Sequence, residues 1–504
     1  MDSQPSYIRT RLSAMFFLQF FIWASWFVPI GGYIISTLKF EGHQVGWIFA
    51  TTALGAIISP LLVGYIADRL FSTERVLCVL HLIGGVCLCL AATQTKFTGL
   101  MTLLMVNAVC FMPTLALANS LAFRNIPDPD KFPRIAMFGS IGWIVSGLGV
   151  GFLLGETSPW FLYLAGGAGI LMGLYCLTLP HTPPKGAGEA GGDVFGLGAI
   201  KLLKEPSFLI FAISAFLIAI PATFYFVGCN AMLVETNRPV PTALMTIGQC
   251  TEIVVMFTMP FFIFQLGLRR ILVIGMVVWA LRYVCFGSLS FPLILLGLIV
   301  HGFAYCFVFV GAYIYVDKRA PRDMRASAQS LIAFLMLGVG MFIGSQLAGF
   351  TMGRYPAPVP AFTDTPKVAS LAAQIDADES GRITGAELLQ IPDEGLKVDK
   401  DTFEKETVSK FFRQVDAGKV LRTKADFRDA IEGKINVTRD DWLQAQSHQW
   451  LPFWLWPAGG AALICVFFLL GSREEKDEKA EDEPETEPTE EQAAEPTGGE
   501  PEEQ

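Results

Sequence analysis

Long apolar runs separated by short polar connections make up most of this chain. Twelve runs of about 20 residues are each long enough to cross a bilayer. They lie at about 14–36, 45–67, 76–94, 100–123, 136–155, 160–180, 207–233, 243–266, 271–288, 291–316, 327–350 and 450–471. Because a spanning segment must satisfy its backbone hydrogen bonds internally, each run predicts a helix and not a strand. The pattern predicts an all-α membrane protein with twelve transmembrane helices.

The composition supports the same class. Of the 504 residues, 52% are hydrophobic and only 16% are charged, so the lipid bilayer is the expected surrounding. All ten cysteines fall within or at the ends of apolar runs, where we expect them to pack as small side chains. No nucleotide-binding loop or hydrolytic constellation supports an enzyme. We also expect no nucleic-acid partner and a monomeric protein.

The basic residues predict the orientation. The N-terminus and every second connection together hold 19 Lys and Arg, whereas the alternate short connections hold only Lys39, Lys96 and Arg238. Lys and Arg are enriched in cytoplasmic loops, so both termini are expected in the cytoplasm. An even number of spans requires the same arrangement. The expected location is the cytoplasmic (inner) membrane, as a multi-pass protein.

The runs and connections divide the chain into five regions. Residues 1–180 form a first six-helix half, and 181–206 form a Gly- and Pro-containing cytoplasmic linker. Residues 207–354 and 449–471 form a second six-helix half, which a small, helical, extracytoplasmic insertion at 355–448 interrupts. The tail at 472–504 holds 15 acidic against 3 basic residues, so we expect it to be disordered and cytoplasmic.

One carboxylate stands inside an apolar run. Glu252 lies three residues after Gln249, so a helix places both side chains on one face. A carboxylate within a membrane is costly and usually marks a solute or proton pathway. The structural alternative is a buried carboxylate bonded to Gln249 or paired with Arg282. The lone histidines, His81 and His301, are expected to pack between helices.

A charged motif follows the second run. Gly64, Asp68 and Arg69 stand in the order GxxxDR, which resembles the signature of the major facilitator superfamily. The glycine allows close helix approach, and the charged pair can latch neighbouring helices at the cytoplasmic side. The resemblance implies two six-helix halves that rock around a central site to give alternating access.

A more specific resemblance extends from the first run to the eleventh. Its segments include Phe17–Trp26, Asn107–Asn119, Gly139–Trp143, Gln249–Glu252 with Pro260, Trp279–Arg282 and Arg325–Gln329. Together they resemble the nucleoside:proton symporter family. The resemblance implies import of nucleosides by proton symport, without a cofactor. It places substrate at Gln19, Ser140, Trp143, Thr223, Phe226, Gln249, Glu252 and Tyr305, with proton coupling at Glu252.

The chain departs from the family at polar positions. Cys306 stands where the family has an aspartate, Ala136 where it has an arginine, and Phe226 at a polar position of the seventh helix. These changes leave open a transporter of a sugar or another small polar metabolite. A membrane receptor or calcium-responsive scaffold is the alternative of another class, and it rests on the insertion and the tail.

The insertion carries a motif of its own. Residues 376–387 fit a twelve-residue EF-hand loop, with Gly381 at the sharp turn. The expected Ca²⁺ ligands are oxygen atoms of Asp376, Asp378, Ser380, Arg382 (backbone carbonyl), Thr384 and Glu387. A second unit around Val415–Phe427 lacks most ligands, and we expect it to pair with the first without metal.

Overall fold

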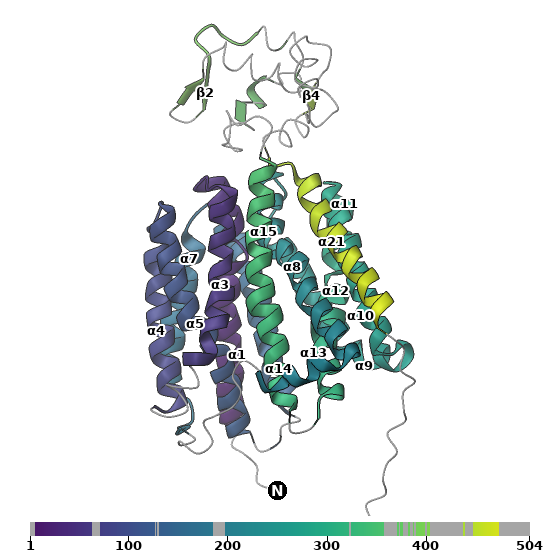
Figure 1. The fold of residues 1–504 in the computed structure, drawn as a ribbon. Helices are drawn as coiled ribbons and strands as arrows, with labels where there is room; N and C mark the ends of the chain where they lie inside the picture. Colours follow the sequence, from purple (N-terminus) through teal and green to yellow (C-terminus); the bar gives the residue numbers. More distant parts are fainter. Residues whose placement is uncertain are drawn as a thin grey trace, which may run out of the picture.

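The computed structural model describes residues 6–62, 71–126, 128, 131–184, 197–321, 324–356 and 447–472, with short pieces between 370 and 438. The described residues form a bundle of long helices in which the first part of the chain packs beside the second (Figure 1). We call the end of the bundle where α15 ends and α21 begins the insertion end. The opposite end, where α1 begins, is the terminal end.

The first part of the bundle contains seven α-helices and two π-helical turns within the described residues. They are α1 (Ser6–Phe27), α2 (Ile30–Gly32), η1 (Tyr33–Thr37), α3 (Gly42–Leu62), α4 (Thr73–Ala91), α5 (Phe97–Asn125), α6 (Phe132–Gly149), η4 (Val150–Leu154) and α7 (Trp160–Cys176). α1, α2 and η1 follow one another almost without a break, as do α6 and η4. Each group is therefore long and apolar enough to form one span.

The second part begins with the 3₁₀ segment η5 (Leu197–Lys204). It continues with α8 (Pro206–Glu235), α9 (Pro241–Leu266), α10 (Leu268–Gly287), α11 (Phe291–Ile299), α12 (His301–Tyr305), η6 (Cys306–Val310), α13 (Gly311–Arg319), α14 (Arg325–Ala333), η7 (Phe334–Gly340), α15 (Met341–Arg354) and α21 (Trp450–Gly471). Pro206 and Pro241 occupy the first turns of α8 and α9, where a missing N–H costs no hydrogen bond.

Where the structure describes the twelve apolar runs, most of their residues are helical. Within the described residues, nine helices are long and apolar enough to cross a membrane, or ten if the bent pair Phe291–Ile299 and His301–Arg319 is one span. α7, with 17 residues, is shorter than the others. The prediction of an all-helical membrane fold is confirmed, whereas the count of twelve spans stays a prediction.

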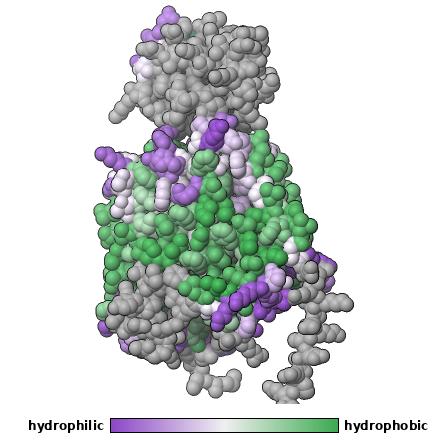
Figure 2. Space-filling model, in the orientation of Figure 1, coloured by the Kyte–Doolittle hydropathy of each residue, from purple (hydrophilic) through white to green (hydrophobic). Residues whose placement is uncertain are grey.

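The outer surface of the bundle fits a bilayer. Figure 2 shows apolar residues spread over the middle of the visible face, with hydrophilic residues gathered near the ends. Phe264 is 85% exposed and Leu470 is 83% exposed, although both are large hydrophobic side chains. An apolar surface of this extent is costly in water and favourable against lipid tails.

The two parts of the bundle meet closely at the insertion end. α3 packs against α15, and their backbones approach at glycines. A Cβ added to Gly349 would lie 2.4 Å from the carbonyl oxygen of Gly42 and 2.8 Å from the Cα of Gly46. These separations are too short for real contacts, so only glycine fits here. We call Gly42, Gly46 and Gly349 the glycine contact.

Short strands lie beyond the insertion end (Figure 1). β1 (Arg382–Ile383) pairs antiparallel with β4 (Val437–Thr438), and β2 (Leu396–Val398) pairs with β3 (Asp401–Phe403). The predicted loop at 376–387 is therefore paired through its middle, but its partner strand is not in the predicted unit around Val415–Phe427. The partner strand lies ten residues beyond that unit, at Val437.

Candidate functional site

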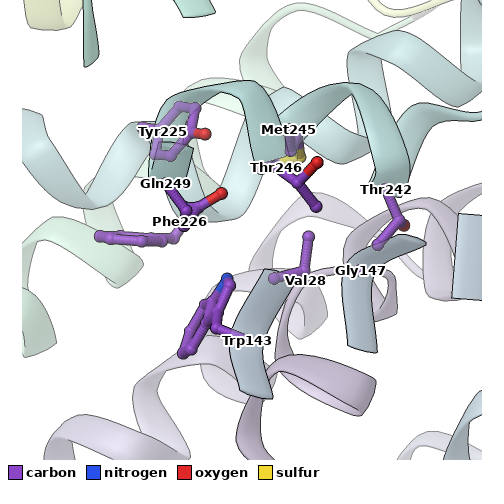
Figure 3. Close-up of a pocket in the computed structure, with 9 residues that line it drawn as sticks. All are labelled: Val28, Trp143, Gly147, Tyr225, Phe226, Thr242, Met245, Thr246 and Gln249. Carbon is purple, nitrogen blue, oxygen red and sulfur yellow. The ribbon is translucent and has the colours of Figure 1, made fainter. Parts of the chain in front are cut away.

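A pocket lies between the two parts of the bundle (Figure 3). Val28 of the first span and Trp143 and Gly147 of α6 line one side. The remaining lining residues come from α8 and α9: Tyr225, Phe226, Thr242, Met245, Thr246 and Gln249. Gln249 is the ninth residue of α9, about 12 Å from the start of the helix at 1.5 Å per residue. Since Thr242 in the first turn of α9 also lines the pocket, the pocket extends from the insertion end into the apolar belt.

Aromatic side chains support the Trp143 side of the pocket. The Trp23 and Trp143 ring centroids are 5.6 Å apart, with an angle of 72° between the rings. The ring centroids of Phe27 and Phe226 are 5.8 Å apart, so an aromatic contact joins the first part of the bundle to α8. Edge-on packing holds Trp143 in place and keeps a flat apolar surface at the pocket.

Glu252 lies one helical turn beyond Gln249, and its carboxylate contacts a histidine ring. Its Oε1 is 2.7 Å from Nε2 of His301 at the start of α12. The Glu252 side chain is 20% exposed, whereas that of His301 is 1% exposed. The structure thus places His301, which the sequence assigned to packing, against the one carboxylate it had singled out.

Arg282 of α10 contacts the other side of His301. Nη1 of Arg282 lies 2.5 Å from Nδ1 of His301. The arginine is fully buried and its guanidinium carbon lies 4.3 Å from the centre of the Tyr225 ring and 4.7 Å from that of Trp279. Cation–π attraction stabilises a guanidinium in such an aromatic enclosure. Since Tyr225 also lines the pocket, the chain Arg282–His301–Glu252 lies directly behind the pocket wall.

The structure brings together only part of the predicted site. Gln249, Trp143 and Phe226 line the pocket, and Glu252 is one turn away. Ser140, Thr223 and Tyr305 are not among the lining residues. Thr223 Oγ1 donates to the carbonyl of Ala219 within its own helix. Tyr305 stacks on Phe309, with 5.0 Å between the ring centroids.

Gln19 also lies outside the pocket, within a buried network of the first part of the bundle. It donates to Thr114 Oγ1 over 2.6 Å, and its Oε1 lies 2.9 Å from Nε2 of His81. All three side chains are buried. These bonds use both ends of the Gln19 amide, so in this conformation it joins α1, α4 and α5.

A second set of buried hydrogen bonds closes the insertion end. Asn230 of α8 accepts from the backbone N–H of Gly32 over 3.0 Å and donates to Thr242 Oγ1 over 3.0 Å. The backbone N–H of Thr242 donates to Glu156 Oε1 over 2.6 Å. Because Gly32 and Glu156 belong to the first part of the bundle, two of these three bonds cross between the parts. We call Gly32, Asn230, Thr242 and Glu156 the insertion-end latch.

The remaining predicted residues can be placed only in part. Gly64, Asp68 and Arg69 lie outside the described residues, as do Asp376, Asp378, Ser380 and Thr384. Arg382 is described as part of β1, and Glu387 is buried. Within the described part of the chain, no group of three or more His, Cys, Asp or Glu could hold a metal ion.

Two packed helical halves with a pocket between them are the arrangement of the major facilitator fold. The family model described as "Nucleoside H+ symporter" matches residues 7–362. The chain belongs to this family, which confirms the predicted resemblance. The family is one of transporters and not of enzymes.

Relatives support this assignment. The YegT protein of Escherichia coli (strain K12) is 42% identical over 371 residues, which are 70% of this chain and 87% of YegT. The xanthosine permease of the same organism is 35% identical over 370 residues, 69% of this chain and 88% of the permease. A crystal structure of a mutant of the nucleoside transporter NupG superimposes with a TM-score of 0.71 at 23% identity, over 92% of this chain and 100% of that one.

Proposed function

We propose that the protein imports nucleosides together with protons by alternating access. The observation that carries the proposal is the pocket between the halves. It offers the Gln249 amide for hydrogen bonds and the Trp143 ring for stacking, with the Glu252 carboxylate one helical turn away. A base with an attached sugar has a planar face and several donors and acceptors, so it fits both kinds of contact. Family membership supports the same substrate class and ion.

Alternating access requires that the pocket open to one side at a time. The insertion-end latch and the glycine contact close the bundle at one end. We propose that this end faces away from the cytoplasm and opens to receive nucleoside and proton. The excess of Lys and Arg in the connections at the terminal end supports this orientation. The protein would then lie in the inner membrane with both termini in the cytoplasm.

Glu252→Gln tests the coupling. The amide keeps the shape of the side chain but cannot bind a proton, so accumulation driven by a pH gradient should be abolished. Uridine exchange without a gradient should continue. The measurement is uptake of labelled uridine into proteoliposomes that contain the purified protein. Wild-type accumulation by the variant would refute the role of Glu252, and transport of a sugar or other metabolite with no nucleoside uptake would refute the substrate.

We further propose that the insertion binds Ca²⁺ through residues 376–387. The complete oxygen-ligand pattern and the β1–β4 pairing, which holds Arg382 and Ile383 in a ladder, support this site. Because the insertion is expected outside the cytoplasm, the ion would be structural there. Millimolar Ca²⁺ should raise the unfolding temperature of the full chain, and Glu387→Ala should remove most of the increase. An equal increase in the variant and the wild type would contradict the site.

A further inference from the structure

We propose that His301 and Arg282 are positioning residues that set the proton affinity of Glu252, in a chain without the acidic residue that the family resemblance implies at position 306. The inference rests on the proposed function, because it concerns the group that would carry the coupled proton. Cys306 is fully buried, and its Sγ lies 3.5 Å from the backbone carbonyl of Glu252. A thiol at this distance is in contact with the α9 backbone but supplies no carboxylate.

The contacts of His301 determine which of its nitrogen atoms carries the proton. The guanidinium of Arg282 has only donors, so the His301 Nδ1 that it contacts must be the acceptor. In the neutral ring the proton is then on Nε2, which points at the Glu252 carboxylate and donates to it. A second proton on His301 would have to occupy Nδ1 and would face the arginine. Arg282 therefore holds His301 neutral.

The same geometry makes Glu252 the proton acceptor of the group. Arg282 and His301 are enclosed, whereas Glu252 is one-fifth exposed and is accessible to a proton. With Glu252 ionised, the positive charge of Arg282 is balanced through the neutral ring. When Glu252 binds a proton, the balance is lost and one uncompensated charge remains inside the membrane domain, which is costly. Proton binding at Glu252 therefore changes the charge balance of Arg282 through His301.

We call Arg282, His301 and Glu252 the relay. Other polar groups beside the relay do not provide an alternative proton acceptor at ordinary pH. Tyr225 of α8 lies 4.7 Å from the His301 ring, centre to centre, and Tyr305 lies 5.9 Å from it on the same stretch of helix. Cys306 contacts the Glu252 backbone. Phenols and thiols are neutral near pH 7, so they bind no further proton there. Thus Glu252 is the only carboxylate in this set.

The relay also connects three helices. Glu252 lies on α9, Arg282 on α10 and His301 on α12, and the backbone N–H of Gly302 donates to Thr251 Oγ1 over 3.1 Å beside them. A change in the charge of Glu252 is therefore felt at the contacts of all three helices. Since α9 also supplies Gln249 to the pocket, the proton and the substrate act on the same helix.

The test is a pH titration of the Glu252 carboxyl in the purified full chain by infrared difference spectroscopy. The carboxyl band is assigned by its loss in Glu252→Gln. His301→Leu removes the donor, so protonation should become easier and the midpoint should rise by about one pH unit or more, a tenfold change in proton affinity. His301→Gln keeps a neutral donor and should give a smaller rise. Arg282→Gln should also raise the midpoint, and the exposed His43→Gln is the matched control.

The outcomes separate this inference from the proposed function. Because neither residue lines the pocket, uridine exchange without a gradient should stay within about threefold of wild type in His301→Gln, while gradient-driven accumulation falls. An unchanged midpoint in a folded His301 variant would overturn the relay. If His301→Leu fails to fold, His301→Gln and Arg282→Gln decide in the same way. If wild-type protein exchanges no uridine, the proposed substrate is wrong, yet the titration still tests the relay.

Discussion

The insertion-end latch predicts that one side chain controls how long the transporter stays closed at that end. Asn230 is fully buried on α8 and bonds to both Gly32 and Thr242. Asn230→Ala removes both hydrogen bonds and leaves the Gly32 N–H and the Thr242 hydroxyl without these partners. Opening of this end exposes the same groups to water. The substitution should therefore destabilise the closed conformation more than the open one.

The magnitude follows from the number of groups left unpaired. A buried polar group that loses its partner costs about 1–3 kcal/mol. Two such groups lose a partner, but the threonine hydroxyl can turn to another acceptor. We therefore expect the substitution to destabilise the closed conformation by about 2 kcal/mol relative to the open one. This corresponds to a shift of roughly 30-fold toward the open conformation, since about 1.4 kcal/mol is a factor of ten.

Spin labels at Glu41 and Arg354 can measure this shift. Both side chains are exposed at the insertion end, one on each half, and Cys250 is replaced by Ser to remove the exposed native thiol. Asn230→Ala should add a population with a longer distance between the labels. Ser214→Ala is the matched control, because this buried serine on α8 donates to the carbonyl of Ile210 in its own helix. A wild-type distance distribution in folded Asn230→Ala would refute the reasoning.

Two further predictions concern the pocket and the insertion. Gln249→Ala should weaken competition by uridine about tenfold or more, about 1.4 kcal/mol, because a polar substrate loses its partner; unchanged competition would remove Gln249 from the site. Burial lowers the pKa of His448, but the Glu235 carboxylate 2.9 Å away outweighs it, so the pKa is raised above its ordinary value. The charged pair stabilises the protein below pH about 6.5, and this contribution is lost as pH rises through the raised pKa. The Tm advantage of wild type over His448→Gln should therefore shrink from about pH 6 to pH 8; a constant difference would contradict the pairing.

The periodic and apolar features of the sequence predicted the bundle well, because bilayer thickness and backbone hydrogen bonding leave few alternatives. Glu252 could also be singled out from the sequence, because a carboxylate is costly within an apolar run. His301 did not, because its role depends on the bend of 42° between Phe291–Ile299 and His301–Arg319 and on contact with α9 and α10. An available signal was Gly302 beside it, whose added Cβ would lie 2.4 Å from the backbone of Thr251.

The placement of Gln19 marks another limit of sequence reasoning. A polar residue in a membrane helix must find polar partners, but the pattern does not say whether they are substrate atoms or other helices. The structure gives Gln19 the side chains of His81 and Thr114. Those partners lie 62 and 95 residues away along the chain, so only the packing of α1 against α4 and α5 reveals the choice.

The glycine contact between α3 and α15 affects how easily the two helices can separate and meet again in each transport cycle. Where large side chains interdigitate, two helices separate only after many rotamers change, and each rearrangement slows the motion. At Gly42, Gly46 and Gly349 backbone faces backbone with little side-chain material between them. The helices can separate at this surface with few changes of side-chain rotamer. The directional bonds of the insertion-end latch lie at the same end, and opening at the glycines separates backbone from backbone.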